Sequence, residues 1–160
     1  MRKEYLIIVM LVLLNSCNND DSIVMYDNIS IQFSLHNTGG DETTVFKSGE
    51  DIEMRFFITN MSGKDLSYHY TGVPLIYEIY NSDTVFATSI DGLVFPQVVI
   101  GNEIKYGETY QSKWLGPNAP YREPQIQLPV GKYKAYVKHG SFFDDYQIKE
   151  TSAIEFTIID

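Results

Sequence analysis

Cysteine is almost absent from this chain of 160 residues, which contains a single one, Cys17. One thiol cannot form an internal disulfide, and it cannot supply a CxxC redox or zinc motif. Disulfide-stapled scaffolds are therefore excluded, and the fold has to be stabilised by an apolar core. The hydrophobic content of 44% and the aromatic content of 14% are ample for such a core in one domain.

The sequence also lacks any apolar run long enough to cross a bilayer as a helix. The longest run, from Tyr5 to Leu14, has ten residues, whereas a spanning helix needs about 20. Ten apolar residues after the charged head of residues 1–4 are typical of the h-region of a secretory signal peptide. We expect residues 1–16 to be such a signal peptide and exclude them from the fold.

The residues that follow this run indicate the kind of signal. Leu14, Asn15 and Ser16 precede Cys17 and resemble the lipobox of bacterial lipoproteins, with an aliphatic residue at minus three and a small one at minus one. The resemblance implies cleavage between Ser16 and Cys17 and lipidation of Cys17, whose acyl chains would hold the protein at a membrane. The alternative is a soluble secreted protein with an isolated cysteine.

Residues 17–28 are predicted to be the lipidated cysteine and a flexible acidic linker. Asn19, Asp20 and Asp21 resemble the acidic tract that directs some lipoproteins to the outside of the outer membrane. The same charges also suit a plain solvated linker, and the sequence leaves both interpretations open. The expected location is the cell envelope, with the outer membrane of a Gram-negative bacterium favoured.

Basic residues are scarce: Lys and Arg number 12 against 21 for Asp and Glu, which gives a net charge of −9. Loss of residues 1–16 removes Arg2, Lys3 and Glu4 and leaves 10 basic and 20 acidic residues. A chain this acidic repels phosphate backbones. Nucleic acid is therefore not an expected partner.

Helical periodicity is lacking as well, and the dominant period is two. In ISIQFSLH (29–36) and DIEMRFFITN (51–60) apolar and polar residues alternate, which is typical of a half-buried strand. Six shorter segments bring the total to about eight strands and predict an all-β, antiparallel sandwich or barrel. These segments are LSYHY (66–70), LIYEIY (75–80), TVFAT (84–88), ETYQSKW (108–114), KYKAYVKH (132–139) and AIEFTIID (153–160).

Four segments between Phe56 and Val137 follow one another in a family-like order: FFITNMSGKDLSYHY, LIYEIYNSDTVFATS, YGETYQSKW and LPVGKYKAYV. Together they resemble the BsuPI-type intracellular proteinase inhibitor family of small Ig-like domains. The resemblance implies a single Ig-like antiparallel β-sandwich over residues 29–160, and it raises proteinase inhibition as an activity. In such a fold Gly131 would allow a sharp turn, and the Tyr133 hydroxyl would turn back toward the backbone as in a tyrosine corner.

Two departures separate this chain from that family. The family usually carries a tryptophan after the hairpin, where this chain has Phe86, Ala87 and Thr88. Its name also describes a cytoplasmic inhibitor, whereas this chain carries an export signal. The fold inference does not depend on either feature, and proteinase inhibition is kept as an alternative activity because fold and function separate easily.

No catalytic or metal-binding constellation is recognisable. His36, His69 and His139 lie in different predicted strands without HxH, HExxH or CxxC spacing, and no GxSxG motif marks a serine nucleophile. We therefore predict that the chain is not an enzyme and has no cofactor or metal. Three acidic pairs could bind calcium, although solubilising charge is the favoured interpretation because none has DxDxDG spacing; they are Asp41–Glu42, Glu50–Asp51 and Asp144–Asp145.

Two segments are candidate binding loops. The connection from 115 to 129 is rich in proline, which removes the amide donors that a strand needs and stiffens the chain. The second segment mixes aromatic rings with carboxylates and suits contact with a protein or sugar, with burial of its phenylalanines in the core as the alternative. The first loop's candidate residues are Pro117, Pro120, Tyr121, Arg122 and Pro124, and those of the second are Phe142, Phe143, Asp144, Asp145 and Tyr146.

These observations favour a membrane-anchored extracytoplasmic lipoprotein whose Ig-like domain is a non-catalytic binding module for a protein or glycan. A proteinase inhibitor of BsuPI-like type and an accessory subunit of an envelope assembly are the alternatives. Twelve tyrosines suit a recognition surface and also suit strand faces. The tyrosines expected to be exposed are Tyr106, Tyr110, Tyr121 and Tyr136.

Overall fold

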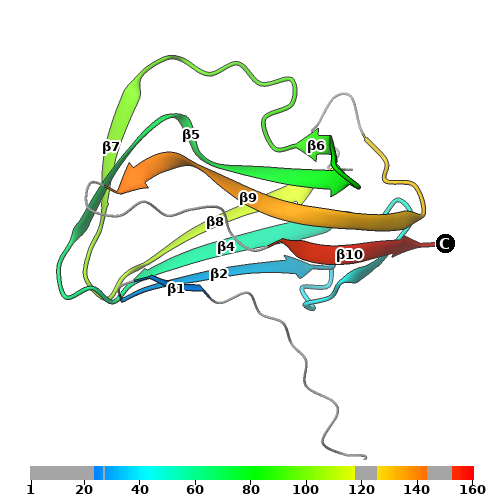
Figure 1. The fold of residues 1–160 in the computed structure, drawn as a ribbon, viewed down its shortest axis with the longest axis horizontal. Coiled ribbons are helices and arrows are strands. Elements are labelled where there is room, and N and C mark those ends of the chain that lie inside the picture. Colours follow the sequence, from blue (N-terminus) through cyan, green and yellow to red (C-terminus); the bar gives the residue numbers. More distant parts are fainter. Residues whose placement is uncertain (1–23, 27, 118–125, 144–152) are drawn as a thin grey trace, which may run out of the picture.

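The computed structural model of the protein describes residues 24–26, 28–117, 126–143 and 153–160. Within these residues the chain forms ten strands and no helix, and the strands build two facing sheets (Figure 1). The prediction of an all-β, Ig-like sandwich is therefore confirmed. In this described part, no helix is available that could span a membrane.

Sheet A contains four antiparallel strands in the order β1-β2-β4-β8. The strands are β1 (Val24–Tyr26), β2 (Ile29–His36), β4 (Ile52–Asn60) and β8 (Thr109–Gly116). Phe33 of β2 lies directly opposite Phe56 of β4, and both side chains are fully buried. The aromatic centre of this sheet thus faces the other layer.

Sheet B has six strands in the order β3-β10-β9-β5-β6, with β7 pairing with β5 as well. The strands are β3 (Val45–Lys47), β5 (Leu66–Asn81), β6 (Thr84–Thr88), β7 (Val99–Ile104), β9 (Gly131–Phe143) and β10 (Ile154–Ile159). The β3–β10 pair is parallel and the other pairs are antiparallel. Strands β9 and β10 therefore lie inside the sheet, where both of their edges are paired.

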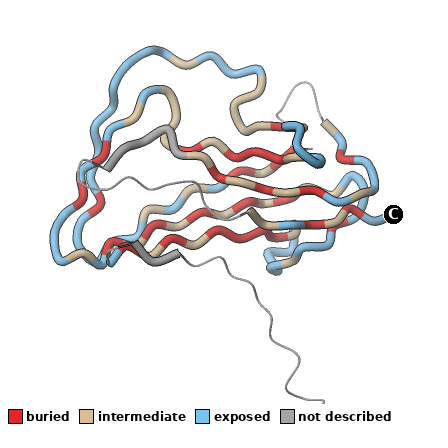
Figure 2. The backbone as a smooth tube through the Cα atoms, in the orientation of Figure 1, coloured by how far each residue is buried: buried red, intermediate tan, exposed pale blue. Residues whose placement is uncertain are grey.

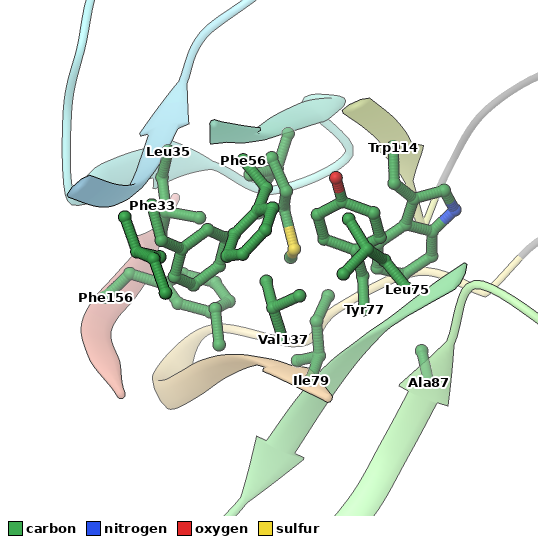
Figure 3. Packing of buried hydrophobic residues seen from close by; sticks show 14 of the residues in the cluster. Phe33, Leu35, Phe56, Leu75, Tyr77, Ile79, Ala87, Trp114, Val137 and Phe156 are labelled. Atoms are coloured by element: carbon green, nitrogen blue, oxygen red, sulfur yellow. The ribbon is translucent and has the colours of Figure 1, made fainter. Parts of the chain in front are cut away.

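The core forms because alternate residues of each strand point between the sheets. Residues of β4 alternate between buried and half-buried from Ile52 to Asn60, and Ala135 and Val137 of β9 are fully buried. Figure 2 shows this alternation along the strands of both layers, and Figure 3 shows Val137 and Ile79 packed beneath the aromatic rings of sheet A. Each such large apolar side chain stabilises the fold by about 1.5–3 kcal/mol.

The strand count is ten rather than about eight, for two physical reasons. The segments 66–70 and 75–80 form one strand, β5, because both pair with β9 on either side of a register shift between Tyr70 and Leu75, where Gly72 has a φ of 80°. Strands β1 and β3 are too short to show a period in the sequence. Strand β7 was not predicted because five of its six residues are exposed, so its sequence lacks an alternating apolar side. Strand β1 lies within the stretch expected to be a linker and pairs with β2.

The strand order is that of an immunoglobulin sandwich. Strands β2-β4-β8 correspond to A-B-E of that fold, and β10-β9-β5 correspond to G-F-C. Near the start of β9, the Tyr133 hydroxyl donates a hydrogen bond of 2.7 Å to the carbonyl oxygen of Pro129. The ring of Tyr133 is buried and stacks on Phe156. The tyrosine corner expected from the sequence is therefore present.

Replacing Tyr133 by Phe keeps the ring and leaves the Pro129 carbonyl without its donor. We expect the free energy of unfolding, measured by urea denaturation, to fall by about 1–2 kcal/mol. Tyr106→Phe is the matched control, since the Tyr106 side chain is 61% exposed, and it should change stability by less than about 0.5 kcal/mol. Equal effects of the two substitutions would contradict a stabilising role for the corner.

Candidate functional site

The outer face of sheet B carries polar and aromatic side chains on its central strands. Because Ala135 and Val137 of β9 point into the core, the residues between and beside them point outward. The register sets Tyr136 opposite Glu78 and Lys134 opposite Tyr80 of β5. We call this surface the tyrosine–lysine face, and its residues are Glu78, Tyr80, Lys132, Lys134, Tyr136 and Lys138.

Glu78 is the centre of a hydrogen-bonded network on this face. It is only 8% exposed, which is rare for a carboxylate unless it is paired. The Lys138 ammonium lies 2.8 Å from Oε2 of Glu78, and the Tyr80 hydroxyl donates to the same oxygen at 2.7 Å. Lys138 Nζ also donates to the Tyr80 hydroxyl at 3.1 Å. These hydrogen bonds, that to Glu78 first, raise the pKa of Lys138 and keep it charged.

Two tyrosine rings stand beside this network. The centroids of Tyr80 and Tyr136 are 5.0 Å apart with an edge-to-face angle of 70°. The Lys138 ammonium lies 5.7 Å from the Tyr80 centroid, within cation–π distance. Both tyrosines are half-buried, so their rings are held in place and still reach solvent. Rigid rings beside fixed polar groups are a common recognition device because little entropy is lost on binding.

A depression of about 320 Å³ adjoins the network near the start of β9. Lys132 and Lys134 line it from β9, Glu155 and Thr157 line it from β10, and Ser82 contributes from the turn between β5 and β6. Val45, Tyr133 and Phe156 also line it, so the depression combines polar and apolar walls, and it lies at the lower end of the size range of small-ligand sites.

A serine and a histidine that sequence reasoning did not connect are hydrogen-bonded on sheet A. Ser34 Oγ lies 2.9 Å from His36 Nε2, and His36 Nδ1 lies 3.0 Å from the carbonyl oxygen of Gly40. A Ser–His pair can form a nucleophile, but Ser34 is only 2% exposed and cannot meet a substrate. The pair instead ties the loop after β2 to the sheet. The i, i+2 spacing on a strand was the clue, since it puts both residues on one face.

In each described acidic pair, one residue is hydrogen-bonded within its own turn. The Asp41 backbone amide bonds to the Asn37 side chain, and Glu50 accepts a hydrogen bond from the Lys47 amide at 2.9 Å. No group of three His, Cys, Asp or Glu in the described residues could hold a metal ion. The calcium alternative therefore gains no support from these two turns, and the pair at 144–145 lies outside the described residues.

The first predicted binding loop is described only at its ends. Pro117 is buried directly after β8. The other candidates, Pro120, Tyr121, Arg122 and Pro124, lie outside the described residues, as do Ser16 and Cys17 of the lipobox.

The second predicted loop begins as a strand. Phe142 and Phe143 belong to β9, where they pair with His69 and Tyr68 of β5, because the β9–β5 ladder resumes beyond the register shift. The other candidates, Asp144, Asp145 and Tyr146, lie outside the described residues.

Of the four tyrosines predicted to be exposed, one is confirmed as exposed. Tyr106 is exposed, whereas Tyr136 and Tyr110 are half-buried. Tyr110 packs edge-to-face on Tyr68 with centroids 6.1 Å apart, and burial raises its pKa. Tyr121 lies outside the described residues.

No family model and no curated protein matches this sequence. Solved structures with distant similarity include a β-glucosidase from Listeria innocua (12% identity, TM-score 0.40), β-glucuronidase 2 from Bacteroides uniformis (10%, 0.39) and the alkylpurine DNA glycosylase AlkC from Pseudomonas fluorescens (14%, 0.43). The alignments cover 81%, 77% and 85% of this chain but only 16%, 12% and 32% of those chains. Similarities at this level carry no information about the function of this chain.

The Glu78–Lys138 contact should couple the two residues energetically. Removing one partner leaves the other incompletely paired, so Glu78→Gln with Lys138→Met should destabilise by less than the sum of the single variants, with a coupling of about 1 kcal/mol. Because the folded pKa of Lys138 is raised above its ordinary 10.5, this stabilisation should be complete below pH 10.5 and be lost as the pH rises through the folded pKa.

The exposed pair Lys134 and Glu155, 3.5 Å apart, is the matched control for this cycle. Its coupling in urea unfolding should stay below about 0.5 kcal/mol. Equal coupling for the two pairs at pH 7 would contradict a distinct role for the Glu78 network.

Proposed function

We propose that this protein is a lipid-anchored, non-catalytic binding module outside the cytoplasm, which binds a protein or glycan on the tyrosine–lysine face. The observation that carries the proposal is the network of Glu78, Lys138 and Tyr80, fixed beside the ring of Tyr136. The network lies on the outside of sheet B, where it contributes nothing to the apolar core. Burying the Glu78 carboxylate costs free energy. A ligand that binds to Tyr80 and Lys138, which the carboxylate orients, would explain why the carboxylate is there.

The position of the face also suits binding. Its side chains project from β5 and β9, which are the two longest strands and pair with each other. Sites on paired strands hold their side chains in a more precise geometry than sites on loops. A ligand therefore meets rings and charges that are already ordered, and binding forfeits little side-chain entropy.

Membrane attachment is proposed from the lipobox-like residues that end at Cys17. Only residues 18–23 separate Cys17 from β1, so even a fully extended connection would hold the domain within roughly 25 Å of the membrane surface. Strand β1 belongs to sheet A. The anchor would therefore lead into one sheet of the sandwich, and the outer face of the other would be free for a ligand.

The binding proposal is tested with residues 18–160, which contain all ten described strands. We expect this chain to bind either an array of purified polysaccharides or immobilised cell-envelope preparations. Binding to envelope that survives proteinase K digestion indicates a glycan, and binding abolished by digestion indicates a protein. Tyr80→Ala combined with Tyr136→Ala should weaken binding at least tenfold, because both rings are removed.

Tyr106→Ala is the control, since Tyr106 is exposed away from this face, and it should bind like the unaltered chain. Cooperative urea unfolding of each variant verifies that it is folded. Two results would overturn the proposal: unaltered binding by the folded double variant, or substrate turnover that a single side-chain change abolishes.

The anchor is tested separately by metabolic labelling with palmitate. The full chain should incorporate the label and partition with membranes, and Cys17→Ala should do neither, because Cys17 is the only thiol of the chain. Labelling that persists in Cys17→Ala would refute the proposed lipid site.

A further inference from the structure

We infer that the depression beside Tyr80 receives the acidic group of a sugar residue, a carboxylate or a sulfate, between Lys132 and Lys134. This inference rests on the proposed function, because the depression is part of the tyrosine–lysine face, and it names the chemical class of the ligand.

Positive charge is concentrated here in a chain whose net charge is −9. Outward positions of β9 carry Lys132, Lys134 and Lys138. The three lysines differ in how closely a carboxylate is paired with them. Lys138 is committed to the buried carboxylate of Glu78 at 2.8 Å. Within the described part of the chain, Lys132 makes no ion pair, and it is exposed. The cationic group nearest solvent in the depression is thus free to take an anion.

Lys134 is only weakly held. Its ammonium lies 3.5 Å from the carboxylate of Glu155, and the two side chains are 44% and 78% exposed. Exposed pairs of this kind contribute about 0–1 kcal/mol, so a ligand anion can displace Glu155 at small cost. Glu155 also lines the depression, and its negative charge repels an anion there. Favourable binding of an anion therefore requires the Glu155 side chain to rotate away.

Three hydroxyl side chains of the lining match the hydroxyl groups of a sugar. Thr44, Ser82 and Thr157 line the depression together with the two lysines, and their hydroxyls both donate and accept hydrogen bonds. Tyr80 lies directly opposite Lys134 in the β5–β9 ladder, where facing side chains are about 5 Å apart at Cβ. The Tyr80 hydroxyl is bonded to Glu78 and Lys138, and Tyr80 is not among the residues that line the depression. Its ring would therefore contact a sugar residue that extends beyond the depression.

The location argues against an acidic peptide as the occupant. Extended peptides commonly bind by adding a strand to an open sheet edge. Lys132, Lys134, Glu155 and Thr157 line the depression from β9 and β10, which have paired neighbours on both sides, and only Thr44 and Val45 reach it from the start of the edge strand β3. No strand can be added at β9 or β10, whereas a compact sugar residue fits a depression of about 320 Å³.

The test uses residues 18–160 and matched saccharides in calorimetric and NMR titrations. The probes are an oligogalacturonide and its neutral methyl ester, and dextran sulfate and neutral dextran, which contain no uronic acid. We expect an acidic member of a pair to bind at least tenfold more tightly than its neutral form and to shift the amide signals of Lys132, Lys134 and Thr157. Affinity for the acidic form should fall with added salt.

Lys132→Gln combined with Lys134→Gln should lose at least tenfold in affinity for the acidic saccharide and little for the neutral one. Lys113→Gln is the control, because Lys113 is an exposed lysine on β8 of the other sheet. Preference for the galacturonide identifies a uronic acid as the source of the charge, and preference for dextran sulfate identifies a sulfated sugar.

Three outcomes would overturn the inference. If acidic and neutral saccharides bind with equal affinity and Tyr80→Ala abolishes that binding, the inference of an acidic ligand is refuted and the binding proposal stands. Tighter binding of poly-glutamate than of either acidic saccharide assigns the lysines to an acidic protein. If no saccharide binds, the inference is refuted. The binding proposal is refuted as well if envelope preparations are also not bound.

Discussion

The structure depends on the meeting of two alternating apolar faces between the sheets. Phe33 and Phe56 of sheet A pack against the layer that contributes Ile79 and Val137 of sheet B (Figure 3). Burial of these side chains fixes the register of each strand, because a slip by one residue would turn its apolar side to water. The same constraint decides what points outward, so the position of Tyr136, between two inward residues of β9, follows from the core.

The outer face of sheet B then acquires its chemistry from pairing between β5 and β9. Glu78 and Lys138 are 60 residues apart in sequence and meet only because the two strands are neighbours. A carboxylate that is 8% exposed is stable there because an ammonium and a hydroxyl replace the water it loses. The network is accordingly ordered before any ligand arrives, which is the property that the binding proposal uses.

Much of the fold could be predicted from sequence because the period of two is a local signal. The strands over 29–36 and 51–60 were predicted in this way and are confirmed. The Tyr133 corner was implied by the resemblance to Ig-like domains and is also confirmed. The joined strand β5 was missed because Gly72 and Pro74 indicate a break that tertiary pairing overrides. The candidate site was not predicted, since its contacts join distant residues, and sequence reasoning had favoured loops over a strand face.

The proposed ligand-binding surface is the outer face of sheet B and not that of sheet A. Residues 18–160 contain no cysteine, so Lys134→Cys and Lys113→Cys each provide a single thiol, one on β9 and one on β8. Each variant is coupled to a maleimide-linked polyethylene glycol and titrated with the saccharide or envelope preparation that the unaltered chain binds. We expect the polymer to block binding when attached at position 134 and to leave binding unchanged at position 113; the reverse result would place the ligand on sheet A.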